Sequence, residues 1–200
     1  MMNSNSLFKT LLAVLLSASM LATGCSTDWV KVALADLPIL TQMALNIGTV
    51  VTSLQSGQQL SPAEAAAIQN ISAQASKDLN LLQALYNDYQ QNPNAGTMQE
   101  IQTAITDLNQ NLPALLQATH ISNPAISSRI AAAVNLILAT VNSFALLMPK
   151  TSMQVSAQIS RPKTALPHAT DLKKQWNQQI CGPSGNAAVD AGLKACAVKP

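Results

Sequence analysis

Residues 61–89 read SPAEAAAIQNISAQASKDLNLLQALYNDY, and this stretch decides the fold class. Ser61 is followed by Pro62 and by Glu64. This order predicts a helix start in which the serine oxygen accepts a backbone N–H and the glutamate reaches back to the serine amide. The apolar residues that follow recur at three- and four-residue steps, which places them on one helix face. They are Ile68, Ile71, Ala75, Leu79, Leu82, Leu85 and Tyr89.

A similar apolar pattern precedes this stretch, from about Asp28 to Leu54. Pro38 lies within the pattern, so we expect either a kink or a separate short first turn. The residues that share one face are Trp29, Ala33, Leu37, Leu40, Ala44, Ile47, Val51 and Leu54.

A third helix is predicted after the turn residues 92–96, with Thr97 as its first cap and Glu100 in the reciprocal capping position. Pro113 predicts a kink or a break near Asn111. The apolar residues have the heptad spacing of a helix bundle. They are Ile101, Ile105, Leu108, Leu112 and Leu115.

A fourth helix is predicted from about Ser122 to Met148, and it is apolar almost all round. Residues 130–148 carry no charge and are long enough to cross a bilayer. The polar residues Asn135, Thr140, Asn142 and Ser143 would each need a partner in lipid, which favours a helix at the centre of a fold. Its main apolar face comprises Ile126, Ile130, Ala133, Ile137, Val141, Phe144 and Met148.

Together these patterns predict an all-α protein, an antiparallel four-helix bundle with a partly extended C-terminal tail. We expect residues 1–24 to be a signal peptide, 25–149 the bundle and 150–200 the tail. Pro162 and Pro167 should keep the first part of the tail extended. One short helix is expected from Asp171 to Ile180 and another over residues 186–195.

The composition agrees with a helical fold. Aromatic residues make up only 3% of the chain and charged residues 10%, whereas about 25% is usual for charged residues. Residues 26–149 hold seven Asp or Glu and three Lys or Arg, and residues 150–200 hold two and seven. The acidic bundle and the basic tail are therefore expected to attract one another, or the tail to face anionic lipid. The tail is too weakly basic for a nucleic-acid surface.

The N-terminal residues have the organisation of a secretory signal. Lys9 precedes an apolar run over residues 11–16, and small residues then lead to Cys25 in the sequence Leu-Ala-Thr-Gly-Cys, residues 21–25. This segment resembles the lipobox of bacterial lipoproteins. The resemblance implies that Cys25 becomes the mature N-terminus and carries diacylglycerol and an acyl chain such as palmitate. Ser26 resembles the outer-membrane sorting pattern of enterobacterial lipoproteins. The alternative is an ordinary secretory signal.

The other two cysteines enclose a short loop near the C-terminus. If Cys25 is acylated, Cys181 and Cys196 remain as a pair that an oxidising compartment can join. Two unrelated free thiols are the alternative. His120 and His168 lack ligand spacing to the cysteines, so no metal site is predicted.

The sequence predicts no enzyme and no cofactor. It contains neither a glycine-rich phosphate loop nor a zinc-binding His-Glu-x-x-His helix. Glu64 and Glu100 are assigned to capping, and Asp78, Asp88 and Asp107 are expected on solvated helix faces. Trp29 follows Cys25 closely, so we expect it at membrane headgroup depth or as a cap on the bundle core.

The leading hypothesis is a non-enzymatic, membrane-anchored envelope lipoprotein that acts as an interaction or structural bundle. It would contact membrane lipid through acylated Cys25 and would bind an envelope protein. The first alternative is a carrier of an apolar ligand held between alanine-rich helices. The second is a membrane-inserting protein that uses residues 123–148.

Overall fold

Six α-helices and one short 3-10 helix form the fold in a computed structural model, which describes residues 28–56, 59–149 and 168–198. Those residues contain no strand. The elements are α2 (Asp28–Ser56), α3 (Pro62–Gln91), α4 (Ala95–Ala118), α5 (Pro124–Leu147), α6 (Ala169–Gln179), α7 (Ala187–Leu193) and the 3-10 helix η1 (Lys194–Cys196).

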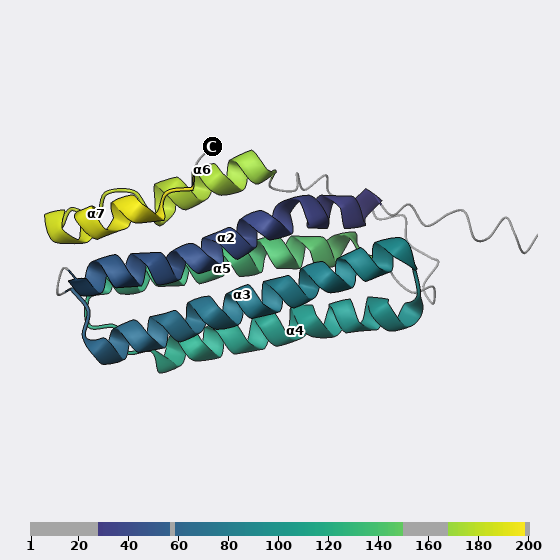
Figure 1. The fold of residues 1–200 in the computed structure, drawn as a ribbon, viewed down its shortest axis with the longest axis horizontal. Helices are drawn as coiled ribbons and strands as arrows, with labels where there is room; N and C mark the ends of the chain where they lie inside the picture. Colours follow the sequence, from purple (N-terminus) through teal and green to yellow (C-terminus); the bar gives the residue numbers. More distant parts are fainter. Residues whose placement is uncertain (1–27, 57–58, 150–167, 199–200) are drawn as a thin grey trace, which may run out of the picture.

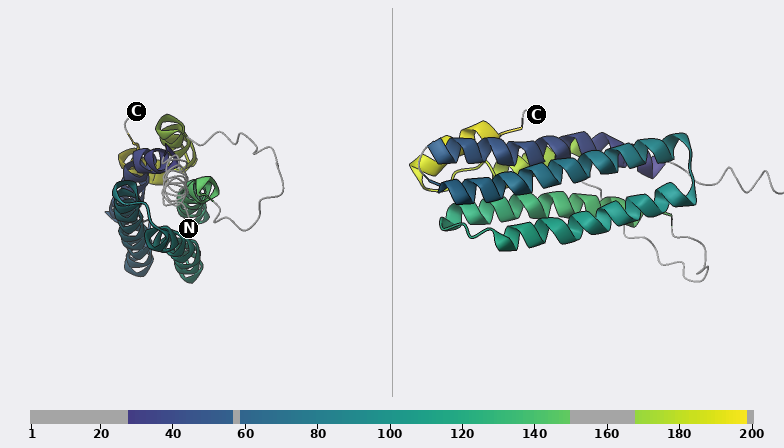
Figure 2. Two further views of the ribbon diagram at one scale, coloured as in Figure 1. Left: turned by 90° about the vertical axis from the view of Figure 1, so that its right-hand side faces the viewer. Right: turned by 60° about the horizontal axis from the view of Figure 1, so that its bottom comes forward.

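The four long helices lie side by side, and each runs antiparallel to the next (Figure 1). In the ring that they form, α2 packs on α3, α3 on α4, α4 on α5, and α5 on α2. Figure 2 shows this ring along its length and from one end. The predicted fold class, an all-α antiparallel four-helix bundle with a C-terminal tail that carries short helices, is confirmed.

The helix starts explain much of this arrangement. Ser61 and Glu64 form the predicted capping box of α3: the Glu64 amide donates to Ser61 Oγ at 3.3 Å, and the Ser61 amide donates to Glu64 Oε2 at 2.8 Å. Asn123 is the N-cap of α5, and its Oδ1 accepts from the Ala125 amide at 3.0 Å. Both caps satisfy N–H groups that have no partner inside the helix.

The predicted start of α4 at Thr97 is wrong. Asn94 is the N-cap, and its Oδ1 accepts from the Thr97 amide at 2.9 Å. The Thr97 hydroxyl instead donates to Asp88 Oδ2 at 3.0 Å, which joins the end of α3 to the start of α4. Glu100 therefore has no capping role.

Neither proline breaks its helix. Pro38 lies inside α2 and Pro113 inside α4, and both helices continue as single elements. A proline costs its helix one backbone hydrogen bond. Leu37 beside Pro38 and Leu112 beside Pro113 are fully buried, so packing on the other helices holds both turns in place.

The predicted apolar faces form one continuous core. The main face of α5 is buried throughout, whereas Leu146 near its C-terminal end is 78% exposed. The polar residues of α5 are accommodated without lipid: Thr140 donates to the Leu136 carbonyl at 2.8 Å, and Asn142 exchanges hydrogen bonds with Asn109 of α4. These contacts support the interpretation of α5 as a core helix.

The tail helices cover α2 and α5. The predicted helix near residues 171–180 is observed as α6, and the one in the cysteine loop as α7 followed by η1. Leu172, Trp176 and Ile180 of the tail are buried and belong to the same core as the bundle. The stretch around Pro162 and Pro167, expected to be extended, lies outside the described residues.

Candidate functional site

The sequence-predicted site residues fall at three places. Cys25 lies outside the described residues. Trp29 stands in the first turn of α2, and Cys181 and Cys196 enclose α7 in the tail. His120 and His168 are both exposed, one between α4 and α5 and the other at the start of α6.

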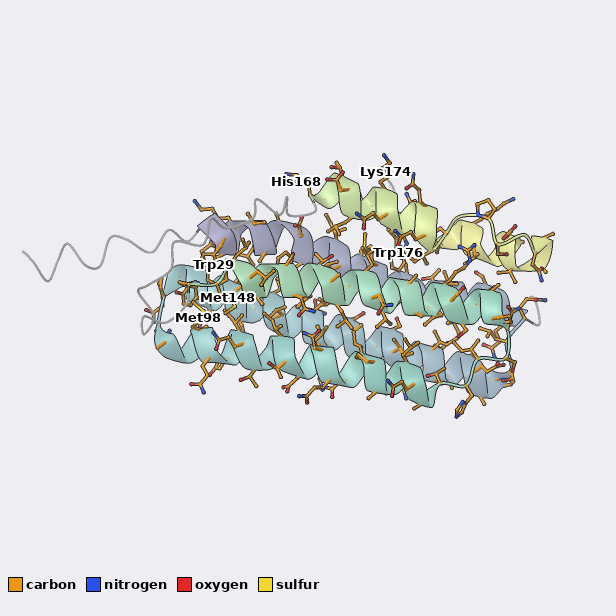
Figure 3. The ribbon with its side chains drawn as sticks, turned by 180° about the vertical axis from the view of Figure 1, so that it is seen from behind. Trp29, Met98, Met148, His168, Lys174 and Trp176 are labelled. Carbon is orange, nitrogen blue, oxygen red and sulfur yellow. A yellow bond between two sulfur atoms is a disulfide. The ribbon has the colours of Figure 1, made fainter. Side chains whose placement is uncertain are left out.

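Aromatic side chains gather at one end of the bundle, which we call the aromatic end. It consists of Trp29, Tyr86, Tyr89 and Phe144, four of the six aromatic residues in the chain. The Trp29 ring lies 5.5 Å from that of Tyr86 and 5.6 Å from that of Tyr89, between centroids. Met148 and Met98 lie at the same end (Figure 3). Trp29 therefore caps the bundle core, which is one of the two roles predicted for it.

Tyr86 is fully buried at this end, and its hydroxyl has no hydrogen-bond partner among the described residues. Burial raises the pKa of Tyr86 because the phenolate would lose its hydration. The residue therefore stays neutral and acts as a packing group between Trp29 and Phe144.

The tail is held to the bundle through backbone carbonyls. Arg129 of α5 donates to the Ile180 carbonyl at 2.8 Å and to the Pro183 carbonyl at 2.7 Å. The Ile180 carbonyl lies at the C-terminal end of α6, where positive charge is favoured by the helix dipole, and Pro183 lies in the loop that follows. A bundle cation thus fixes the end of the tail helix.

A second set of contacts fixes the end of the chain. The Cys196 carbonyl accepts from Trp176 Nε1 at 2.9 Å and from Asn46 Nδ2 of α2 at 3.1 Å. Cys181 and Cys196 form a disulfide with their Cα atoms 5.8 Å apart, so the predicted pairing is observed in the structure. The tail interface therefore combines a covalent bond, buried apolar residues and hydrogen bonds.

The described part of the tail shows few charge contacts with the bundle, and Lys150, Arg161, Lys163 and Lys199 lie outside the described residues. Lys173 and Lys174 of α6 make no ion pair with any described residue. One charge interaction joins His168 to Asp36 of α2, a carboxyl only 4% exposed, and another joins Asp190 of the tail to Arg129 of α5. Burial raises the pKa of Asp36, and the neighbouring His168 lowers it by a smaller amount.

Asp78 was expected on a solvated face, and that prediction is wrong. It is 9% exposed; Oδ1 accepts from Gln74 Nε2 at 2.8 Å, and Oδ2 has no partner among the described residues. The apolar neighbours Ala75, Leu79 and Leu82 draw this side of α3 into the core and carry Asp78 with it. Asp88 and Asp107 are exposed, as predicted.

Glu64 links two parts of the bundle at the end opposite Trp29. Besides capping α3, its Oε1 accepts from the amide and the hydroxyl of Ser122, at 2.6 Å and 2.8 Å, in the turn between α4 and α5. These hydrogen bonds lower the pKa of Glu64 to about 2, the Ser122 amide having the largest effect.

We predict that Glu64 makes the bundle sensitive to acid. A carboxyl whose pKa is lowered by folding stabilises the protein above its ordinary pKa of 4.5, and this contribution is lost as the pH falls towards 2. Glu64→Gln should therefore lose less stability than the parent protein between pH 7 and pH 2.5. Because the site is solvated, the Glu64→Gln substitution itself should lower the free energy of unfolding at neutral pH by less than about 1 kcal/mol.

Thermal melting across that pH range measures the effect. Glu100→Gln is the matched control, because Glu100 accepts no hydrogen bond from the described residues. If the melting temperature falls by the same amount at low pH in Glu64→Gln and in the parent protein, the prediction is contradicted.

The described part of the molecule contains a small cavity beside the tail and an open groove on another side. A cavity of about 10 Å³ lies where α2, α5 and the tail meet, and Ile47, Ile130 and Ile180 line it. An open groove of about 500 Å³ runs along the outer side of α3 and α4, and we call it the α3–α4 groove. Its lining residues are Leu81, Leu85, Gly96, Gln99, Glu100, Thr103, Ala104 and Asp107.

The described residues contain no group of three or more His, Cys, Asp or Glu side chains that could hold a metal ion. Two Ser-x-x-Lys spacings, a pattern found in some serine hydrolases, occur at Ser6–Lys9 and Ser160–Lys163 and lie outside those residues. By length and composition, α2 and α5 are apolar enough to cross a membrane, as many core helices are.

Comparison with protein families, characterised proteins and solved structures finds no match to this chain. Sequence reasoning missed three features: Arg129 at the tail, the burial of Asp36 and the α3–α4 groove. Only the groove had a local signal, the adjacent pair Leu81 and Leu82, of which one had to face outward.

Proposed function

We propose that this protein is a lipid-anchored component of the bacterial cell envelope whose helical bundle binds another protein and performs no catalysis. The lipobox-like segment ending at Cys25 supports the anchor.

The small size of the cavity between the bundle and the tail is the observation that carries the binding role. Pockets for small ligands usually have volumes of about 300–1,000 Å³. The internal cavity where the tail meets the bundle is about 10 Å³, which holds at most one water molecule. This favours recognition at the outer surface over the alternative of an apolar-ligand carrier. A co-purifying lipid in native mass spectrometry would instead favour the carrier.

The aromatic end is the part that we propose to face the membrane. Three residues separate Cys25 from Trp29, which allows a reach of roughly 10–14 Å. Trp29 is only partly buried by the bundle, and tryptophan is favoured at headgroup depth. Leu146, the most exposed large apolar residue described, lies near the end of α5 that reaches this side of the bundle.

The membrane-inserting alternative makes a different prediction. In it, α5 would leave the bundle, although its main apolar face is now buried against the other helices. Carbonate extraction of a Cys25→Ala variant separates the two possibilities. Release from the membrane supports the anchored bundle, and retention supports insertion.

We predict that Cys25 is the acylated mature N-terminus. Each buried CH₂ of an acyl chain stabilises membrane attachment by about 0.8 kcal/mol, so two or three chains hold the protein firmly. Cys25→Ala should accumulate as an uncleaved or soluble form. Mass spectrometry of the mature N-terminus checks this, and a start at another residue or a lipid-free cysteine would contradict it. By the sorting resemblance of Ser26, we expect the outer membrane.

Cross-linking in the native envelope, with identification of the cross-linked protein, tests the binding role. A stoichiometric protein partner supports the proposal. If cross-linkers placed on every exposed helix face recover no protein, the binding role fails.

A further inference from the structure

The two sides of the bundle differ in how they are covered. The tail helices α6 and α7 lie along α2 and α5, while α3 and α4 form the opposite side (Figure 1). No other described element packs on the outer side of that pair. The α3–α4 groove lies there.

The floor of the groove is apolar on the α3 side. Leu81 is 52% exposed, and Leu85 follows one turn later, partly buried. Gly96 and Ala104 on α4 have little or no side chain, so the leucines stand above the α4 surface. Gly96 to Asp107 spans about 16 Å of helix, the length of about three turns.

The rim of the groove is acidic. Glu100 and Asp107 are seven residues apart on α4, so they lie two turns apart on the same side. Both are exposed, and neither has a hydrogen bond or an ion pair with a described residue. Two unpaired carboxylates therefore border the exposed leucine.

The tail shows what kind of element fits between two helices of this bundle. Helix α6 has 11 residues and contacts both α2 and α5. Its buried residues Leu172 and Trp176 are four apart, Ile180 follows at the same spacing, and lysines lie beside them. An element of this length and pattern matches the α3–α4 groove in size, apolar spacing and charge.

We infer that the α3–α4 groove binds a basic amphipathic helix of about three turns, supplied by the protein partner. An apolar residue of that helix packs on Leu81, and its lysine or arginine side chains pair with Glu100 and Asp107. This inference rests on the proposed binding role and names its surface and the chemistry of the partner.

The first test places a photo-cross-linking residue at position 81 of the full-length protein in its native envelope. Leu45 of α2 is the matched control, because it is 50% exposed and does not line the α3–α4 groove. We expect cross-links from position 81, with the linked peptide mapping to a helix that carries basic residues beside apolar ones. Cross-links from position 45 alone would show that the partner binds elsewhere than in the α3–α4 groove, while the proposed binding role would still hold. A cross-link from position 81 to a second copy of this chain would overturn the inference that a different protein supplies a basic helix.

The second test uses a defined probe and the full-length protein in detergent. The probe is a synthetic peptide of roughly 12 residues with leucine every fourth position and lysine beside it, and its twin carries glutamate in place of lysine. Fluorescence anisotropy should show binding of the lysine peptide only. Glu100→Gln combined with Asp107→Asn should weaken binding by about five- to tenfold at low salt.

Leu81→Ser should weaken binding of the lysine peptide, whereas Leu45→Ser should not. Equal affinity of the two peptides, or an unchanged affinity in Leu81→Ser, would overturn the inference. Because both leucines are exposed, neither substitution threatens the fold.

Discussion

Replacing Phe144 with alanine should lower the free energy of unfolding by about 3–5 kcal/mol. Phe144 is fully buried in α5, and its ring packs edge-on against Tyr86 with the centroids 6.5 Å apart. The substitution leaves a cavity beside the ring of Tyr86, whose hydroxyl has no partner among the described residues. Ile137→Ala in the same buried face should cost about 2–5 kcal/mol.

Thermal or urea unfolding measures both losses. Leu146→Ala is the matched control: it lies on the same helix but is exposed, so its effect should stay within about 0.5 kcal/mol. A melting temperature that neither Phe144→Ala nor Ile137→Ala changes would remove α5 from the core. The membrane-inserting alternative would then be favoured.

Loss of the Cys181–Cys196 bond should be the next largest effect. The two cysteines are 15 residues apart, and closing a loop of that length contributes about 3 kcal/mol in the chain-entropy model. Reduction should release the tail before the bundle unfolds. Trypsin should then cut after Lys173, Lys174 and Lys194, while Lys77 in the middle of α3 stays protected.

A tail that is equally resistant before and after reduction would contradict this expectation. Thiol titration of the exported protein gives an independent check, because two reactive thiols would mean that the bond does not form in the cell. A Cys181→Ala, Cys196→Ala double variant separates the effect of the bond from that of the reducing agent.

The sequence predicted those parts of the fold that depend on near neighbours. The capping box at Ser61 and the apolar faces of the helices involve residues three or four apart, so they are visible in the chain itself. The start of α4 was missed because Asn94 and Thr97 are both suitable caps. The choice depends on Asp88, on the preceding helix, which takes the Thr97 hydroxyl.

Long-range contacts explain the other errors. Arg129 is the only arginine in the part of the sequence predicted to form the bundle. Its hydrogen-bond partners lie about 50 residues further along the chain. Asp78 has the sequence neighbours of a surface residue, and its burial depends on how α3 lies in the ring. The α3–α4 groove stays uncovered because the tail packs on the other side of the bundle. No local sequence pattern shows which side the tail covers.

The tail also has a consequence for chains whose synthesis stops early. Synthesis proceeds from the N-terminus, so α2 is the first bundle helix to emerge and α6, α7 and η1 are the last elements described. A chain cut short before residue 169 lacks Leu172 and Trp176, and the surfaces of α2 and α5 that they cover stay open to solvent. An interrupted chain should therefore expose apolar surface of α2 and α5 that the finished chain buries.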